Sequence, residues 1–241
     1  SLLQRRSLNE NRFESEYLLG CEKFRKYNID EAFDLLLEPA LADYKDARRY
    51  LYYCISTVIR CRKISRYRFE DLMSREDLVD HGFALYVIGV FAMYVRNDNA
   101  MTYSYAVRSM EAGSDYGTML YVMCHEFGYG VEKNFERVFP RLRRLALNGN
   151  VLAQFRYGRM LIYGWNGTKD VELGSRLIKG GADSGDINCL EQLADLYLWG
   201  ISMDSDPKVA EDIYNRLVSM GWVEAYDMLG MMFCYDKDGK V

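Results

Sequence analysis

The sequence predicts an all-α fold: a right-handed α-solenoid, or superhelix, of about six helical hairpins of roughly 36 residues each, followed by a terminal helix. Two observations support this prediction. Glycines recur with a step of 36 residues in two series, Gly113, Gly149, Gly185 and Gly221, and Gly128, Gly164 and Gly200. Between these glycines, apolar residues recur at helical spacing. A fixed period of this length is typical of stacked repeats, in which each unit buries its apolar face against its neighbours.

The first helix of each repeat is predicted to follow a glycine of the first series. Counted from that glycine, positions 4, 8, 9 and 12 fall on one helical stripe. Position 4 is small in every repeat, as expected where two helices approach closely, and position 8 is bulky. The four columns are Gly117, Ala153, Cys189 and Ala225; Tyr121, Tyr157, Leu193 and Leu229; Val122, Gly158, Ala194 and Gly230; and His125, Leu161, Tyr197 and Phe233. A glycine of the second series then predicts a left-handed cap that ends the helix.

The second helix of each repeat is predicted to begin after a short loop. Asn134, Asp170 and Asp206 align with one another, and with Asp98 one repeat earlier. An Asn or Asp just before a periodic stretch predicts an N-cap, because its side-chain oxygen can accept a free backbone N–H. Each repeat is therefore predicted to be a hairpin of two capped helices.

These columns resemble the pattern of the Sel-one-like repeat family, a relative of the tetratricopeptide repeat. Residues 128–131 read Gly-Tyr-Gly-Val and match the family's loop, and residues 149–150 match the end of its hairpin. The loops at 164–167 and 200–203 depart from the pattern, and His125 replaces the usual aromatic residue. The resemblance implies a solenoid that acts as an adaptor or scaffold, in a family with many bacterial members.

The repeats also predict how the chain is organised. Residues 1–80 are expected to form divergent helical hairpins, and residues 81–241 one continuous solenoid of Sel-one-like repeats. The expected repeats are 81–116, 117–152, 153–188, 189–224 and a partial repeat at 225–241. The resemblance is strong over 113–235, moderate over 81–116 and weak before that. The individual helices expected outside the full repeats are 15–24, 30–37, 47–60, 69–78 and 225–235, with a buried helix at 83–95.

Composition favours a soluble helical protein with 49% hydrophobic residues, only 3 prolines and a net charge of -4. The longest apolar run, residues 83–95, is too short to span a bilayer, so membrane insertion is not expected. No secretory signal is visible, which favours a cytoplasmic location, although a signal could have been removed. The cysteines show no regular pairing, and Cys124, Cys189 and Cys234 are expected to be reduced core thiols.

Catalysis is not expected, and neither is a cofactor or a metal. His81 and His125 are the only histidines, and they have no metal-ligand spacing. Cys124 and His125 are adjacent on a helix and point about 100° apart, so they cannot form a nucleophile–base pair. His125 is instead expected to be a partly buried packing residue. The 128–130 glycine loop lies between helices, whereas a dinucleotide-binding loop follows a strand.

Nucleic acid is not expected as a partner either. Basic residues do cluster, at Arg137, Arg141 and Arg144 and at Arg60, Arg62, Lys63, Arg66 and Arg68. The negative net charge and the acidic residues between positions 183 and 212 argue against binding to phosphates. A protein or peptide partner is expected, and the oligomeric state stays open.

The expected partner-binding surface lies on the first helices, which by resemblance line a concave groove. One column is aromatic in five successive repeats: Phe91, Phe127, Tyr163, Trp199 and Tyr235. The other residues expected at the groove are Met119, Met123, Phe155, Arg159, Glu191, Asp195, Asp227 and Met231. Either each aromatic ring packs over the loop of its own hairpin, or the rings line a groove for a peptide or helix. The acidic residues near the C-terminal end predict a partner segment with Lys or Arg.

The function expected from these features is that of a non-catalytic protein–protein interaction scaffold, which binds a peptide or helix of its partner in the concave groove. The alternative is a regulatory domain of a longer signalling or enzyme polypeptide. A hydrolase-like enzyme is disfavoured, because the sequence offers no catalytic constellation.

Overall fold

The computed structural model describes the backbone of residues 2–60, 66–202 and 204–235, and these residues form helices and loops with no strand. The all-α prediction is therefore confirmed. By its contacts the chain separates into two compact units, Ser1–Phe135 (unit 1) and Glu136–Val241 (unit 2). The domain boundary expected at residue 80 stays a prediction.

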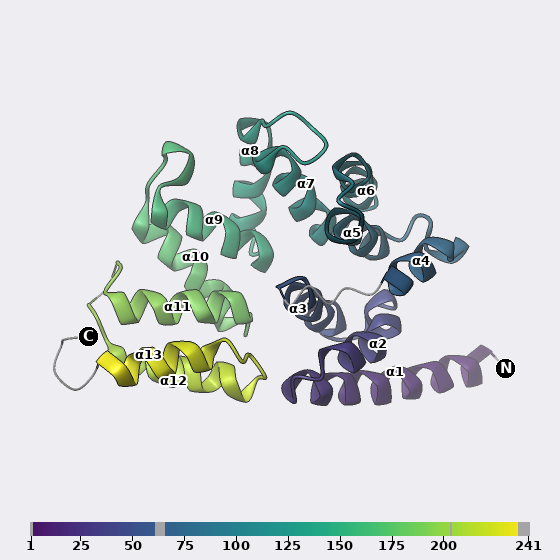
Figure 1. Cartoon of the computed structure of the whole chain (residues 1–241), viewed down its shortest axis with the longest axis horizontal. Helices are drawn as coiled ribbons and strands as arrows, with labels where there is room; N and C mark the ends of the chain where they lie inside the picture. The colour runs from purple at the N-terminus through teal and green to yellow at the C-terminus, as the bar shows by residue number, and fades with distance from the viewer. Residues whose placement is uncertain (1, 61–65, 203, 236–241) are drawn as a thin grey trace. The chain divides into compact units, whose positions relative to one another are not determined.

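The helices follow the predicted hairpin order (Figure 1). In unit 1 they are α1 (Leu2–Arg25), α2 (Ile29–Leu41), α3 (Ala47–Arg60), α4 (Arg66–Ser74), the short η1 (Glu76–Leu78), α5 (Gly82–Phe91), the π-helical η2 (Ala92–Arg96), α6 (Asn99–Glu111) and α7 (Asp115–Phe127). Helix α8 (Phe135–Leu147) begins at the boundary. Unit 2 continues with α9 (Val151–Tyr163), the short η3 (Trp165–Gly167), α10 (Val171–Asp183), α11 (Ile187–Trp199), α12 (Pro207–Ser219) and α13 (Ala225–Tyr235).

The expected helices at 47–60 and 225–235 match α3 and α13. Helix α1 is longer than expected, because it already begins at Leu2. Helix α2 continues to Leu41 with Pro39 inside its last turn. The single helix expected at 69–78 is divided into α4 and η1.

The glycines at the hairpin corners have the left-handed backbone that the repeat pattern predicts. Gly113, Gly149, Gly185 and Gly221 have φ values of +81°, +87°, +78° and +91°. Gly128, Gly164 and Gly200 cap α7, α9 and α11, with φ values of +81°, +72° and +62°. The backbone N–H of each of these caps donates to the carbonyl four residues earlier, so the glycine closes the helix end.

The aspartates predicted as N-caps of the second helices are confirmed. Each accepts a hydrogen bond from the backbone N–H three residues later: Asp98 from Met101, Asp170 from Leu173 and Asp206 from Val209. Asn134 directly precedes α8. The first helices have a matching set that the sequence analysis did not identify, in which Ser114, Asn150 and Asp186 cap α7, α9 and α11.

Helix α5 forms much of the core of unit 1. It is buried from Phe83 to Phe91 and packs against α4, α6 and α7. Phe91 is only 1% exposed, and its ring stacks on Phe33 of α2 with 5.9 Å between the centroids. The expectation that Phe91 lies exposed at a groove is therefore wrong, because α5 is covered by neighbouring helices.

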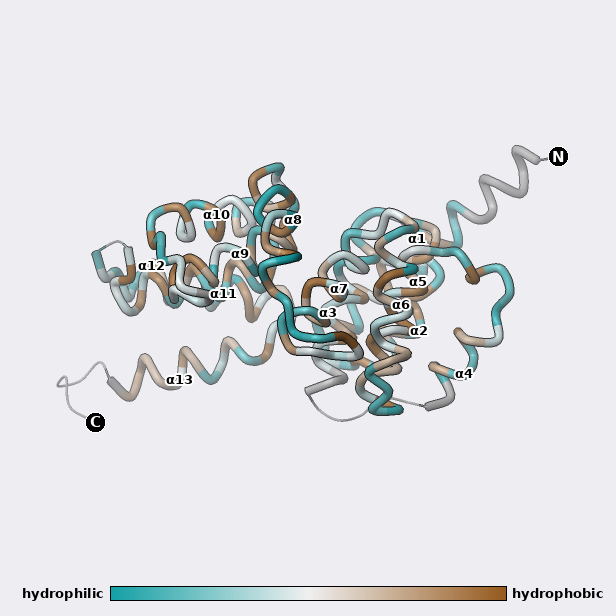
Figure 2. Tube along the Cα trace, turned by 90° about the horizontal axis from the view of Figure 1, so that it is seen from above, coloured by the Kyte–Doolittle hydropathy of each residue, from teal (hydrophilic) through white to brown (hydrophobic). Residues whose placement is uncertain are grey.

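In unit 2, α9 to α13 pack in sequence order, each against the next. Hydrophilic and hydrophobic stretches alternate along α9 to α12 (Figure 2). The predicted small columns lie where helices approach closely: a Cβ built on Gly158 would lie 3.0 Å from the carbonyl oxygen of Gly174 on α10. A Cβ on Gly181 would lie 2.3 Å from the sulfur of Cys189. A larger residue at either crossing would require its neighbours to move.

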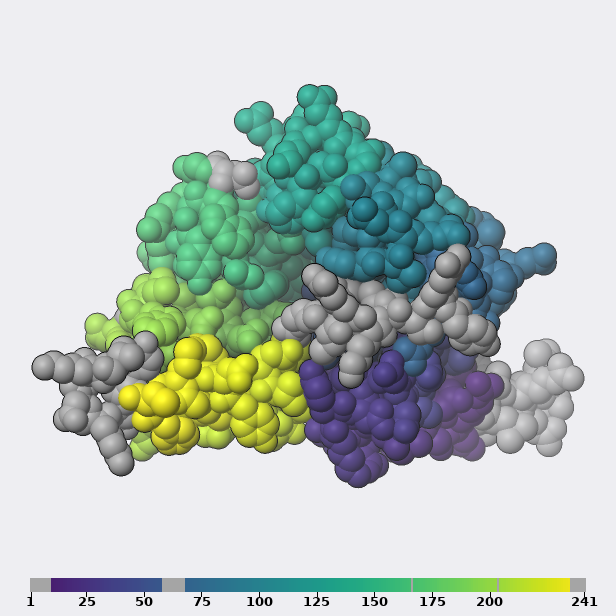
Figure 3. Space-filling model, in the orientation of Figure 1, coloured from purple at the N-terminus to yellow at the C-terminus, as the bar shows by residue number. Residues whose placement is uncertain are grey.

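Helix α13 buries one side only. Ala225 and Leu229 are 0% and 7% exposed, and α13 packs on α12. One turn further along the same stripe Phe233 is 68% exposed, and Gly230 beside Leu229 has no atom within 4 Å of an added Cβ. In the earlier repeats the equivalent column is covered, as at Leu161, which is 2% exposed. Figure 3 shows α13 in yellow, with no described residues over the side that faces the viewer.

Candidate protein-interaction surface

Unit 2 carries three large exposed rings at the ends of its first helices. Tyr163 ends α9, Trp165 follows it in the loop, and Trp199 ends α11. Their exposed fractions are 41%, 43% and 59%. We call these three residues the aromatic surface. Exposed rings of this size offer a large apolar contact area at a small cost in side-chain entropy.

Tyr163 is held in place from two sides. Its ring stacks on that of Trp165, with 5.5 Å between the centroids and 25° between the planes. Its hydroxyl accepts a 2.9 Å hydrogen bond from Nε2 of the buried Gln192 on α11, which links two successive first helices. Tyr163 thus packs on the loop of its own hairpin, as one interpretation expected, and still keeps much of its ring exposed.

Arg159 lies one helical turn before Tyr163 and is half-buried among three rings. Its guanidinium carbon is 5.4 Å from the ring centre of Phe155, 5.9 Å from that of Tyr163 and 5.2 Å from that of Trp165. Contacts of this kind contribute about 0.5–1 kcal/mol each at exposed sites. Nε of Arg159 is buried without a hydrogen-bond acceptor, and no described residue pairs with the guanidinium.

The acidic residues expected at the groove are partly engaged inside the unit. The hydroxyl of Tyr214 donates a 2.6 Å hydrogen bond to Asp195, and the indole of Trp222 donates a 3.2 Å bond to Glu191. Burial raises the pKa of Asp195, while the Tyr214 hydrogen bond and the charge of Arg159 act in the opposite direction. Two of the three carboxylates therefore satisfy buried donors, and only Asp227 is exposed.

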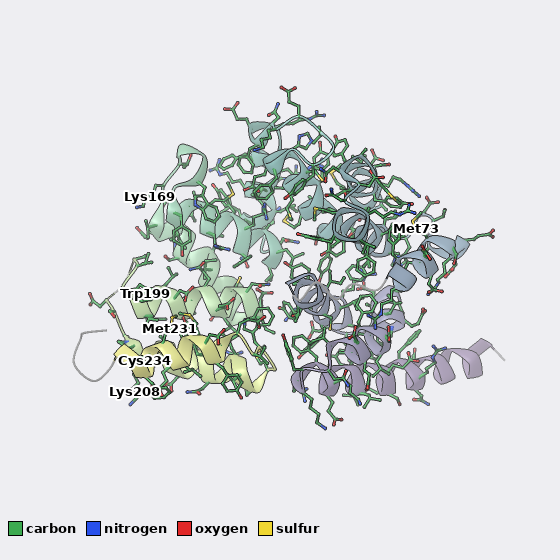
Figure 4. The ribbon with its side chains drawn as sticks, viewed as in Figure 1. Met73, Lys169, Trp199, Lys208, Met231 and Cys234 are labelled. Carbon is green, nitrogen blue, oxygen red and sulfur yellow. The ribbon has the colours of Figure 1, made fainter. Side chains whose placement is uncertain are left out.

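A pocket of about 590 Å³ opens where α11 ends and α12 begins. Its walls are formed by Leu198, Asp206, Pro207, Lys208, Glu211, Leu229, Met232 and Phe233. Trp199, Lys208, Met231 and Cys234 lie at this same end of unit 2 (Figure 4). Met231 is 43% exposed, as expected. Cys234 is also exposed, so it is wrongly predicted as a core thiol. The side chain of Tyr235 lies outside the described residues.

In unit 1, the predicted surface residues have mixed positions. Phe127 is 46% exposed, and its ring lies 5.7 Å from that of Tyr129 in its own loop. Met123 is half-buried. Met119 is only 8% exposed, which contradicts the expected exposure, because α7 packs against both α5 and α6.

His125 is a packing residue, as predicted, although it is more buried than expected. It is 1% exposed, and its ring lies edge-on to Tyr121 and Tyr103, with 4.7 Å and 5.7 Å between the centroids. These two aromatic neighbours explain why histidine fits a column that holds Leu, Tyr and Phe in the other repeats.

The buried thiols are poor nucleophiles. Burial raises the pKa of Cys124 to about 12 and also raises that of Cys189, so both are protonated at neutral pH. The part of the chain that the structure describes contains no group of three or more residues arranged to hold a metal ion.

Of the two expected basic clusters, only the one on α8 has all of its side chains among the described residues. Arg137, Arg141 and Arg144 are exposed on α8. The side chains of Arg60, Arg62, Lys63 and Arg66 and all of Cys61 lie outside the described residues. Arg68 pairs with Asp30 and Asp34 on α2, each at 2.8 Å, and lies over the ring of Phe33. Its charge is therefore balanced within unit 1.

Solved structures share this arrangement of helices. A Sel1 (Sel-one) repeat protein from Oxalobacter formigenes superimposes with a TM-score of 0.58 and 18% identity, over 70% of each chain. The chain has the Sel1-like repeat fold. A protective antigen present in uropathogenic Escherichia coli strains, which displays an SLR fold, gives a TM-score of 0.52 and 19% identity. That match covers 99% of this chain and 53% of the antigen, so this chain spans about half of its length.

The Sel1-like repeat fold confirms the resemblance predicted from the glycine columns and the Gly-Tyr-Gly-Val loop. No family model and no curated protein matches the sequence. Among the described residues, no helix combines the length and apolar character needed to cross a membrane.

Sequence reasoning missed Trp165 and most of the pocket. Trp165 lies in the loop at 164–167, which departs from the Sel1-like pattern, and that departure was the available signal. Leu198 lies on α11, whereas Met232 and Phe233 lie on α13, and nothing in their spacing indicates that they meet.

Proposed function

We propose that this chain is a non-catalytic interaction scaffold that binds a peptide or short helix of a partner protein along the first helices of unit 2. The aromatic surface carries this proposal: Tyr163, Trp165 and Trp199 are each more than 40% exposed. Aromatic rings of this kind are the side chains that most often dominate binding at protein interfaces.

The fixed positions of these side chains support the proposal. Tyr163 is stacked and hydrogen-bonded, so binding would cost it little further conformational freedom. The pocket beyond Trp199 offers apolar walls from Leu198 and Phe233, and Lys208 and Glu211 supply charges at its side. An apolar side chain of a partner segment would find a recess there of the usual size for a binding pocket.

The alternative, a regulatory domain of a longer polypeptide, would use the same surface for a segment of its own chain. In both cases the binding residues are the same, so the first experiment addresses them directly.

A photo-reactive amino acid at position 199 tests the proposal in source cells. The covalent partner is identified by mass spectrometry, and its recombinant segment is then titrated against purified protein. Tyr163→Ala/Trp165→Ala should weaken binding of that segment at least about tenfold. Tyr226→Ala is the matched control, because Tyr226 is an exposed aromatic residue of unit 2, at 60%, in the first turn of α13, whereas Tyr163 and Trp199 end their helices.

Circular dichroism first establishes that all variants are folded. Equal affinity of the wild type and the double variant would refute a role for the aromatic surface. The same conclusion would follow if cross-linking from position 199 gave no more product than cross-linking from position 226.

A further inference from the structure

Arg159 lies beside Tyr163 and Trp165 of the aromatic surface and has no ion pair or hydrogen bond with any described residue. Phe155, Tyr163 and Trp165 surround its guanidinium at 5.2–5.9 Å, which restricts the rotamers of a normally mobile side chain. Of its nitrogens, only Nε is buried without an acceptor. The Nη groups donate no hydrogen bond to a described residue, so their N–H donors reach solvent.

A second cation without an ion pair to any described carboxylate lies beside the same loop. Lys169 precedes α10, and its side chain folds back over Gly164, with its Cβ 3.2 Å from where a Cβ on Gly164 would lie. Lys169 is exposed and is labelled in Figure 4. No described carboxylate forms an ion pair with it.

Three acidic groups of unit 2 accept hydrogen bonds from other donors. Asp195 is the carboxylate whose charge interacts with Arg159, yet it accepts the hydroxyl of Tyr214 and makes no ion pair with the guanidinium. Asp170 caps α10 through the backbone N–H of Leu173. Glu191 accepts the indole N–H of Trp222. None of these carboxylates forms an ion pair with Arg159, so its exposed donors are open to a group outside the chain.

A guanidinium presents its donors as a planar fork that matches the two oxygens of a carboxylate. The rings around Arg159 exclude water from one side, which strengthens a charge-assisted hydrogen bond made on the other. The exposed faces of Trp165 and Tyr163 offer contact for apolar atoms next to that carboxylate.

We propose that Arg159 and its three surrounding rings bind an Asp or Glu side chain that is flanked by apolar residues in the partner segment. This inference rests on the proposed function and names the chemistry of the segment bound. It reverses, for this site, the expectation of a Lys- or Arg-bearing partner, because two of the three carboxylates behind that expectation are engaged within unit 2.

Two capped pentapeptides provide the test, acetyl-Gly-Phe-Asp-Phe-Gly-amide and its counterpart with Asn in place of Asp. Each is titrated into the full chain at low salt and followed by NMR. The wild type should bind the Asp peptide about tenfold more tightly than the Asn peptide. Added salt should weaken binding of the Asp peptide alone.

Arg159→Gln should abolish the preference for the Asp peptide, and Arg159→Lys should retain part of it. Arg176→Gln is the matched control, since Arg176 is an exposed arginine on α10 of the same unit, and it should retain the full preference. These substitutions are at partly or fully exposed positions, and their folding is checked by thermal denaturation.

Equal binding of the two peptides to the wild type would overturn the inference, and so would a preference that survives in Arg159→Gln. Failure of both peptides to bind would also overturn it. None of these results decides the proposed function, which the cross-linking at position 199 tests with the partner itself.

Discussion

At the scale of single residues, glycines with a left-handed backbone have two distinct reasons to be glycine. Gly149 has a φ of +87°, and an added Cβ would meet no atom within 4 Å. Gly130 has a φ of +69°, and an added Cβ would lie 2.1 Å from the carbonyl oxygen of Asn99. The first position therefore requires only a left-handed backbone. The second also requires that the loop touch the start of α6.

These two glycines predict unequal losses on substitution by alanine. Gly149→Ala should lower the free energy of unfolding by about 1–2 kcal/mol, the cost of a left-handed backbone with a Cβ. Gly130→Ala should lower the free energy of unfolding by the same backbone cost and by about 1–3 kcal/mol more, because the loop must move away from α6. Urea denaturation measures both losses. Equal losses at the two positions would contradict the role given to the contact with Asn99.

At the scale of helices, one repeat column can hold residues with opposite roles. Leu161 of α9 and Phe233 of α13 occupy the same column. Leu161 is 2% exposed, and the neighbouring position Gly158 contacts α10. Phe233 is 68% exposed, since no second helix follows α13 among the described residues to cover it. Burial by the second helix of the hairpin, and not the column itself, makes a residue part of the core.

Truncation of these two side chains should therefore have different consequences. Leu161→Ala should cost about 2–5 kcal/mol, because it leaves a cavity between α9 and α10. Phe233→Ala should change the free energy of unfolding by no more than about 0.5 kcal/mol, as for most exposed positions. Denaturant titration of both variants measures this difference. A large loss for Phe233→Ala would mean that its side chain is covered in solution.

At the scale of the whole molecule, helices pack chiefly against their neighbours in sequence. This holds within unit 1 for α1 to α3 and for α5 to α7, and within unit 2 for α9 to α13. In such repeat proteins, stability is approximately a sum of terms for each repeat and for each interface between adjacent repeats. Damage to one repeat is then transmitted mainly to its neighbours.

Leu193→Ala tests this local transmission. Leu193 is 8% exposed on α11, and its truncation should cost about 2–5 kcal/mol. Backbone amides of α10 to α12 should exchange with deuterium at least roughly 30-fold faster, as a loss of about 2 kcal/mol implies. Amides of α2 and α5 should keep their wild-type rates. A uniform increase along the chain would instead mean that both units unfold in one cooperative step.

The repeat pattern determined most of the fold without tertiary information. Within each 36-residue repeat, the left-handed glycines and the Asp98, Asp170 and Asp206 caps are local features, because each depends on backbone groups within a few residues. Such features can be predicted from spacing alone. Trp199 and Met231 were also expected to be exposed, and they are.

Tertiary packing alone decided which of the predicted surface residues are accessible. Phe91 and Met119 have the spacing of surface residues, yet both are buried, because α5 and α7 have neighbours on more than one side. The rings around Arg159 and the hydrogen bonds of Asp195 and Glu191 likewise join residues from a helix to a loop or to another helix. A sequence period specifies which residues share a helix face. Whether that face is covered depends on how the neighbouring repeat packs against it.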